Sequence, residues 1–295
     1  MVLDMLLIDH DQCVVTCDRD EKIRVSDFPD SYNIRSYCLG HTAFVISLVC
    51  DSRQKVLMSG SGDCTVRLWS LQGKQLLTHN VLTDLPSCDV IQDDPNPEPP
   101  STETTDKPST DGVTTGHRPA IQQLCFCEPC GLLCVAMYRS PQVLIYQLTY
   151  PPPSPDPDTD ISQPSLSLLT SLSAEGLVLS MSVSGCVLWL LSQRDSILKL
   201  SAHRMDGAAG TVQEVEPSAT GEGGVSRLLH VIGGQADFLT VTDLGAPDPI
   251  PHLWKSHTDG YIEEYKERKR QRMEGKEESR WGRKHQRRPE RQTKR

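Results

Sequence analysis

The sequence predicts an all-β protein assembled from repeated propeller blades of short antiparallel strands. Three observations predict it. Apolar, β-rich runs of 4–8 residues recur along the chain between turn residues. Two of these regions repeat at a spacing of 43 residues, which is typical of a β-propeller blade. No stretch before residue 255 shows a sustained helical period.

The clearest repeat joins the first two units. Residues 13–26 and 56–70 superimpose without a gap when Asp20 is placed on Asp63. This alignment gives Asp20 the turn position of its unit, so we expect its role to lie within the blade. Ser26 occupies the position that Trp69 has in the second unit, so the copies are degenerate.

A third unit and several later runs extend the pattern. Residues 131–148 align with Tyr146 on Trp69, one period plus roughly 34 residues later, and Ser140 stands where aspartate would be. The later runs predicted as strands lie within residues 176–202, 227–234 and 237–243. Counting strands predicts about four to five blades in residues 1–245, whereas a closed ring of this blade size needs about seven.

Composition divides the rest of the chain. Residues 86–115 are rich in Pro, Thr, Ser and Asp, and residues 150–165 are rich in Pro, so we predict a disordered insertion and a Pro-rich loop. Residues 246–259 are predicted to be a linker, and residues 260–295 to be a basic helix that continues into a disordered tail.

Charge is distributed unevenly. The net charge is -9, yet residues 266–295 hold 14 of the 30 basic and 5 of the 39 acidic residues, so this tail carries +9 and residues 1–265 carry -18. Basic tails contact the phosphates of nucleic acid or serve nuclear import; a merely solvated tail is the alternative. The basic residues considered for these roles are Lys269, Arg270, Arg272, Arg283, Lys284, Arg287 and Arg288.

The second unit carries a set of polar residues at a distinctive spacing. His41 precedes Asp63 by 22 residues, and Trp69 follows six residues later, with Ser59 or Ser61 between them. This pattern resembles the WD-repeat family, in which His, Ser or Thr, Asp and Trp form a hydrogen-bonded network inside a blade. The resemblance assigns these residues a structural role. A catalytic Ser-His-Asp interpretation is not needed, because the network accounts for all of them.

A closer resemblance covers residues 16–69, which contain the strings DRDEKIRVS, YCLGHTAFVISLV and SGSGDCTVRLW. This segment resembles the non-catalytic WD-repeat subunit of the eukaryotic tRNA (guanine-N7)-methyltransferase. The resemblance implies a seven-bladed propeller that binds and stabilises a separate catalytic subunit in a heterodimer. That partner binds S-adenosylmethionine and methylates a guanine in the tRNA variable loop. The similarity begins at the first residue, and the blades expected upstream are missing.

The resemblance also implies which residues face the catalytic subunit. It places residues 18–26 on that surface, with the charged candidates Arg19, Glu21, Lys22 and Arg24. Along a strand Lys22 and Arg24 share one face, while Ile23 and Val25 point to the other. We therefore expect Lys22 and Arg24 to make the contact, and a solvated polar face is the alternative.

The cysteines raise the question of a metal. Eleven unevenly spaced cysteines argue for free thiols in a reducing compartment. Cys127 and Cys130 have the C-x2-C spacing of a zinc knuckle, and Cys125 and Cys134 lie close by, but no second pair follows at a suitable interval. Buried free thiols are therefore favoured, and no metal site is predicted.

These observations lead to one functional prediction. We expect a non-catalytic scaffold subunit of a tRNA methyltransferase complex with no cofactor of its own, since no glycine-rich loop follows a convincing strand. We expect contact with tRNA mainly through the complex, no membrane contact, and a location in the nucleus, with the cytoplasm also open. The alternative is a generic WD-repeat adaptor in a ubiquitin-ligase or chromatin complex.

Overall fold

The computed structural model describes residues 1–85, 118–151, 163–195, 197–218, 224–233 and 250–254. The chain divides into two compact units, residues 1–247 and 248–295. The described part of the first unit contains four antiparallel sheets of four strands and one helix, and the described part of the second contains one short helix.

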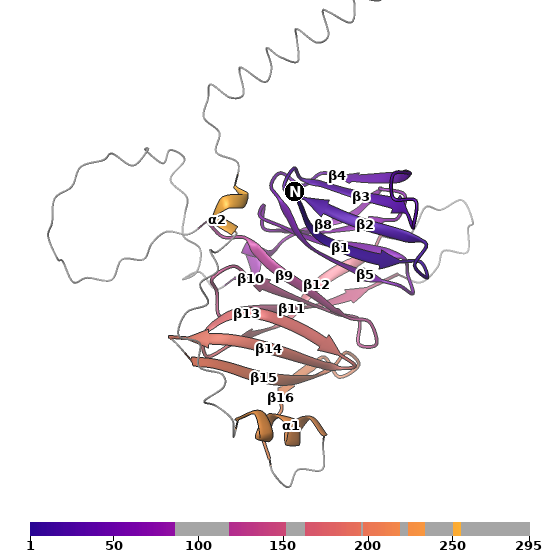
Figure 1. The fold of residues 1–295 in the computed structure, drawn as a ribbon. Coiled ribbons are helices and arrows are strands. Elements are labelled where there is room, and N and C mark those ends of the chain that lie inside the picture. The colour runs from indigo at the N-terminus through magenta and orange to yellow at the C-terminus, as the bar shows by residue number, and fades with distance from the viewer. Residues whose placement is uncertain (86–117, 152–162, 196, 219–223, 234–249, 255–295) are drawn as a thin grey trace, which may run out of the picture. The chain divides into compact units, whose positions relative to one another are not determined.

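Each sheet is formed by four consecutive strands paired in chain order, which can be followed by colour in Figure 1. The first sheet contains β1 (Val2–Ile8), β2 (Cys13–Asp18), β3 (Lys22–Asp27) and β4 (Ile34–Leu39). The second contains β5 (Val45–Asp51), β6 (Val56–Ser61), β7 (Thr65–Ser70) and β8 (Gln75–Asn80), followed by a 3-10 helix at Val81–Asp84. The third contains β9 (Ile121–Cys127), β10 (Leu132–Met137), β11 (Gln142–Thr149) and β12 (Ser165–Ser173). The fourth contains β13 (Leu177–Ser184), β14 (Val187–Arg194), β15 (Ile197–Asp206) and β16 (Thr211–Glu214).

The first strands of neighbouring sheets lie side by side and run parallel. Strand β1 contacts β5, β5 contacts β9, and β9 contacts β13. The Gln122 side chain donates to the Leu179 carbonyl, and further along the same two strands the Cys127 thiol donates to the Gly185 carbonyl, so residue numbers rise together. The same order holds for the pairs Asp4–Leu48, Asp9–Lys55, Ser47–Leu124 and Ser52–Glu128.

This parallel arrangement gives the sheets two distinct ends. The β2–β3, β6–β7, β10–β11 and β14–β15 turns share one end with the connections between sheets; we call it the Asp63 end. The β1–β2, β5–β6, β9–β10 and β13–β14 turns share the opposite end, together with the turns between third and fourth strands; we call it the Cys127 end.

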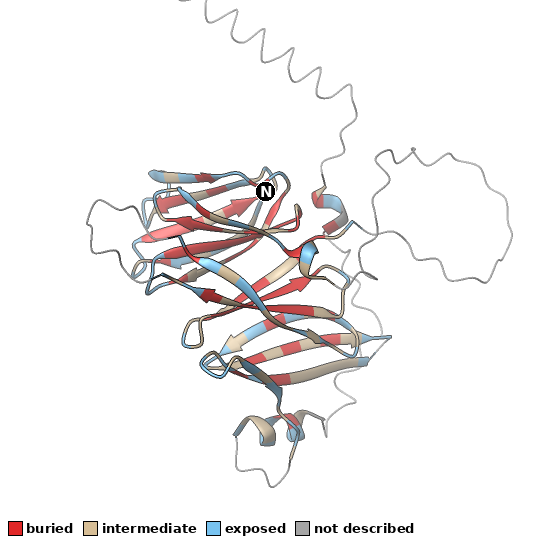
Figure 2. Ribbon diagram, turned by 180° about the vertical axis from the view of Figure 1, so that it is seen from behind, coloured by how far each residue is buried: buried red, intermediate tan, exposed pale blue. Residues whose placement is uncertain are grey.

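Apolar side chains fill the space between neighbouring sheets. Every residue of β6 and β10 is buried, because neighbouring sheets cover both faces of these strands. Figure 2 shows buried residues in red along the strands of the sheets. Burial of one such aliphatic side chain contributes roughly 1.5–3 kcal/mol. The fourth sheet, by contrast, has exposed or half-buried residues in all four strands. Three core clusters each join two successive sheets: the first contains Ile23 and Leu57, the second Leu68 and Leu133, and the third Ile145 and Leu188.

The four sheets confirm the predicted all-β fold of repeated blades. Strands β6 and β7 begin 43 residues after β2 and β3, as the repeat predicts. The described residues contain four blades and no fifth sheet, and no strand of the first sheet pairs with the fourth.

One strand prediction is wrong. Residues 227–234 were predicted to be a strand, but residues Gly224–Gly233 form the helix α1. A short apolar run such as Leu-Leu-His-Val-Ile fits either structure, and in α1 it is amphipathic, with Leu229 buried while Leu228 and Val231 are exposed. The second helix, α2, is Ile250–Leu253, so the prediction of no helix before residue 255 is also wrong. Among the described residues, neither helix is long and apolar enough to cross a membrane.

Several predicted segments lie outside the described residues. They are the insertion 86–115, most of the loop 150–165, the strand 237–243 and the basic segment 260–295. Their predicted structures, and the domain boundaries that depend on them, stay predictions.

Candidate partner-binding surface

The second blade contains a continuous chain of buried hydrogen bonds. His41 lies just before β5 and joins two elements: its Nδ1 is 2.9 Å from Asp63 Oδ2, and its Nε2 is 2.7 Å from Ser59 Oγ. The Trp69 indole N–H donates to the same Ser59 oxygen at 2.8 Å. Ser59 and Trp69 are fully buried, and His41 is 5% exposed. The chain therefore ties the entry to the blade to its second and third strands.

Electrostatics specify the protonation of this chain. Burial lowers the pKa of His41, although Asp63 opposes that shift, so the ring is neutral at pH 7. Burial would raise the pKa of Asp63, but hydrogen bonds from His41, Thr65 and the Thr42 amide outweigh it and hold this pKa below its usual range. The consistent assignment has Nδ1–H donating to Asp63 and Ser59 O–H donating to Nε2. All groups serve structure, and no nucleophile is left poised for attack.

The lowered pKa of His41 predicts that stability depends on pH. The unfolded chain binds this proton near pH 6.5, but the folded chain binds it only at lower pH, so stability present above pH ~6.5 is lost as pH falls. We expect the free energy of unfolding to fall by up to about 1.4 kcal/mol per pH unit below that point from this residue. Urea titrations at pH 7.5, 6.5 and 5.5 measure it.

The matched variant for this prediction is His41→Gln. Burial also lowers the pKa of His203, so part of the wild-type slope comes from that residue. The slope in His41→Gln should be smaller than in the wild type. An unchanged slope would show that His41 does not carry the effect.

The same turn is built differently in the first blade. In the second blade the Asp63 carboxylate accepts the Thr65 amide, and the Ser61 hydroxyl accepts the Asp63 amide. In the first blade one carboxylate, Asp18, accepts the amides of both Asp20 and Lys22 at 2.9 and 3.0 Å. Asp18 is buried, whereas Asp20 is exposed. The residue that caps this turn is therefore Asp18, which the sequence analysis missed, and not Asp20.

The third blade has other residues at the positions of Asp63 and Trp69, as the repeat alignment predicts. The hydroxyl of Ser140 accepts the Gln142 amide at 3.0 Å, so serine takes the turn position that Asp63 has in the second blade. Tyr146 is fully buried at the position of Trp69, and its hydroxyl donates to Asp84 at 2.9 Å. His79 lies 2.6 Å from the same carboxylate. Asp84, on the 3-10 helix, is a second structural carboxylate that sequence spacing did not indicate.

Strand β3 presents its charged residues as expected, but they are not equivalent. Ile23 and Val25 are buried, while Lys22 is exposed and Arg24 half-buried. The Arg24 guanidinium lies 2.7 Å from the Asp18 carboxylate, and the two side chains are 30% and 5% exposed. Arg24 therefore supports the turn that presents Lys22.

The other two candidates lie in the β2–β3 turn itself. Arg19 and Glu21 are half-buried, and Glu21 has a φ of +69°, matching Cys64 with +59° at the same place in the second blade. The turn thus repeats one backbone geometry in both blades. It presents Arg19, Glu21 and Lys22 together at the Asp63 end.

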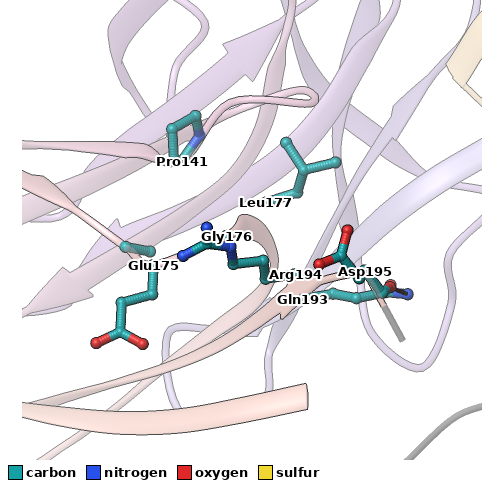
Figure 3. Close-up of a pocket in the computed structure, with 8 residues that line it drawn as sticks. Pro141, Glu175, Gly176, Leu177, Gln193, Arg194 and Asp195 are labelled. Carbon is teal, nitrogen blue, oxygen red and sulfur yellow. Dashed lines mark hydrogen bonds between the residues drawn. The ribbon is translucent and has the colours of Figure 1, made fainter. Parts of the chain in front are cut away.

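A surface hollow of about 470 Å³ lies at the same end, between the third and fourth blades (Figure 3). Its walls come from the β10–β11 turn, the β12–β13 connection and the β14–β15 turn. Glu175, Arg194 and Asp195 give it charged groups of both signs, and Glu175 pairs with Lys199 at 2.5 Å. The hollow is open, and most of its accessible lining is apolar, so these charged groups border an otherwise apolar recess. The lining residues labelled in Figure 3 are Pro141, Glu175, Gly176, Leu177, Gln193, Arg194 and Asp195.

The basic candidates lie elsewhere. Lys269, Arg270, Arg272, Arg283, Lys284, Arg287 and Arg288 are all outside the described residues. Their contact with tRNA or an import receptor stays a prediction.

Fold and network together define the class of protein. Repeated four-stranded blades, with a buried His-Asp-Ser-Trp chain at a blade entry, are those of a WD-repeat protein. The chain belongs to the family described as the tRNA methyltransferase TRM82 WD40 domain, whose model matches residues 1–186. This match confirms the family resemblance seen in the sequence.

Individual relatives match a shorter region. The chain is 46% identical over 82 residues to the tRNA (guanine-N(7)-)-methyltransferase non-catalytic subunit wuho of Drosophila ananassae, which is 28% of this chain and 20% of that protein. It is 45% identical over 86 residues to the non-catalytic subunit WDR4 of Bos taurus, covering 29% and 21% of the two chains. It is 51% identical over 78 residues to WDR4 of Mus musculus, covering 26% and 19%. The matched region thus spans about a fifth of the length of these curated relatives.

Proposed function

We propose that this chain is a non-catalytic subunit that binds and stabilises the catalytic subunit of the tRNA (guanine-N7)-methyltransferase. The complex would form N7-methylguanine in the tRNA variable loop, with S-adenosylmethionine bound by the partner. The observation that carries the proposal is the family match over residues 1–186, which contain the β2–β3 turn and the complete network of the second blade.

The geometry of the Asp63 end supports this role. Lys22 is exposed on a strand whose opposite face is packed in the core, so its position is rigid while its charge is accessible. Asp18 accepts the Lys22 amide and pairs with Arg24, and these two interactions hold the turn in place. A rigid, charged turn is suited to recognising a complementary surface, because little side-chain and backbone order must be gained on binding.

The proposal extends to the tail and to location. Residues 266–295 carry +9 and would attract the tRNA backbone, direct nuclear import, or do both. We propose a nuclear heterodimer, with a cytoplasmic pool also compatible with this chain.

Charge reversal at Lys22 tests the partner surface. We expect Lys22→Glu to weaken binding of the catalytic subunit roughly tenfold, on the order of 1.4 kcal/mol, because a contact charge at a rim is inverted. The unfolding midpoint should not change. Titration of the purified catalytic subunit against the full chain measures the affinity, and the N7-methylguanine content of tRNA in depleted cells measures the consequence.

The matched control is Lys74→Glu. Lys74 is also an exposed lysine, but it lies in the β7–β8 turn at the Cys127 end. If both substitutions weaken binding of the catalytic subunit equally, the effect comes from overall charge, and Lys22 is not a specific contact. If the wild-type chain recovers no methyltransferase from cells and restores no N7-methylguanine, the methyltransferase role itself fails and the adaptor alternative takes its place.

A further inference from the structure

Three thiols from two blades converge at the Cys127 end. Cys127 ends β9 and Cys130 lies in the β9–β10 turn of the third blade, while Cys186 lies in the β13–β14 turn of the fourth. Their sulfur atoms all lie within 4.8 Å of one another. Cys127 is fully buried, and the other two are half-buried, so the group is reachable from solvent at one side.

The β9–β10 turn is shaped to hold both of its thiols. The amides of Cys130 and Gly131 both donate to the Cys127 carbonyl, at 3.2 and 2.8 Å. Gly131 has a φ of +66°, which glycine adopts without strain, and this closes the C-x2-C-G turn before β10 begins. The two sulfurs of such a turn can serve one ion, as they do in zinc ribbons.

The fourth blade packs closely against this turn. A Cβ atom on Gly207 would lie 2.0 Å from the Cys130 carbonyl oxygen, so only glycine allows this approach. The thiols of this turn also contact the fourth blade: Cys127 donates to the Gly185 carbonyl at 3.3 Å, and Cys130 donates to the Met205 carbonyl at 3.4 Å. The three sulfurs therefore lie at a close, hydrogen-bonded contact between the third and fourth blades.

We propose that Cys127, Cys130 and Cys186 bind one zinc ion that joins the third and fourth blades, with water in the fourth position. Tetrahedral coordination with a Zn–S distance of about 2.3 Å separates the sulfurs by roughly 3.8 Å, so the observed cluster needs to contract by about 1 Å or less. Thiolates select borderline-soft ions such as zinc over magnesium or calcium.

The neighbouring cysteines stay outside this site. The Cys125 thiol donates to the Met181 carbonyl, and Cys134 packs 3.8 Å from the Met205 sulfur, both in the apolar layer between the sheets. Sequence spacing pointed to these two as companions of Cys127 and Cys130. The third ligand comes instead from the following blade, where no spacing rule within one hairpin would find it.

A zinc ion here would strengthen the fourth blade, whose strands are less buried than those of the second and third. The site lies at the end opposite to the β2–β3 turn. Its presence or failure is therefore independent of the methyltransferase proposal.

The experiment uses the full chain purified under reducing conditions. We expect one equivalent of zinc per chain, and after exchange one equivalent of Co²⁺ with the near-ultraviolet thiolate charge-transfer and visible bands of a tetrahedral site. Removing the metal should lower the melting temperature. Cys186→Ser and Cys130→Ser should each lose the bound equivalent and the charge-transfer band, while Cys50→Ser, a half-buried thiol outside the cluster, should keep both.

Three results would overturn the proposal. They are a wild-type chain with no bound zinc and no cobalt thiolate band, zinc retained in full by Cys186→Ser, or a disulfide among the three residues found by mass spectrometry in the chain as isolated from cells. The zinc content and the cobalt spectrum of the wild-type chain are sufficient to reject the proposal, so the test remains valid even if a serine variant fails to fold.

Discussion

Replacing Asp63 with alanine is expected to destabilise the chain by about 3 kcal/mol, the result of leaving buried donors without a partner. Its carboxylate accepts from His41 and from the amides of Thr42 and Thr65. Alanine removes every one of these acceptors, and the buried His41 ring cannot reach water without opening the blade. Urea unfolding of the full chain, followed by tryptophan fluorescence from the buried Trp69, measures the loss.

The matched control is Asp20→Ala. Asp20 occupies the aligned position of the first blade, but it is exposed and Asp18 caps the turn. We expect this substitution to change the free energy of unfolding by less than about 0.5 kcal/mol. Similar losses at Asp20 and Asp63 would show that the two turns are equivalent after all, and no loss at Asp63 would show that its network does not stabilise the blade.

The turns of the first two blades differ in what sequence spacing could predict about them. The interval between His41, Asp63 and Trp69 could be recognised because each blade repeats the same strand lengths and turns, so a fixed spacing corresponds to a fixed place. The spacing could not show that Asp18, and not Asp20, caps the turn of the first blade. In the string DRDEK either acid can cap a turn, and the choice depends on which one the adjoining β3 buries beside Arg24.

Contacts between blades could not be predicted from the sequence for a related reason. A repeat describes one blade at a time, whereas Cys186 meets Cys127 only because neighbouring first strands run parallel and in step. Tyr146 likewise reaches Asp84 across a blade boundary. The helix α1 was missed because a short apolar run has no period long enough to separate helix from strand.

The second large effect is expected at Arg24. Arg24→Glu should destabilise the chain by about 2 kcal/mol, because it removes the partner of a buried carboxylate and sets a like charge beside it. Two backbone amides still bind Asp18, so the loss is smaller than at Asp63. The urea midpoint should fall, and binding of the catalytic subunit should weaken as the turn loses its support.

Lys22→Glu, two residues away on the same strand, distinguishes a residue that contacts the partner from one that supports the turn. It should leave the urea midpoint unchanged while weakening the partner, whereas Arg24→Glu should change both measurements. Because the Arg24 side chain is 30% exposed and the Asp18 side chain only 5%, the cost of Arg24→Glu comes from the buried carboxylate and should persist at high salt. A wild-type midpoint for Arg24→Glu would mean that the ion pair does not hold the turn, and Arg24 would then return to the surface as a direct contact.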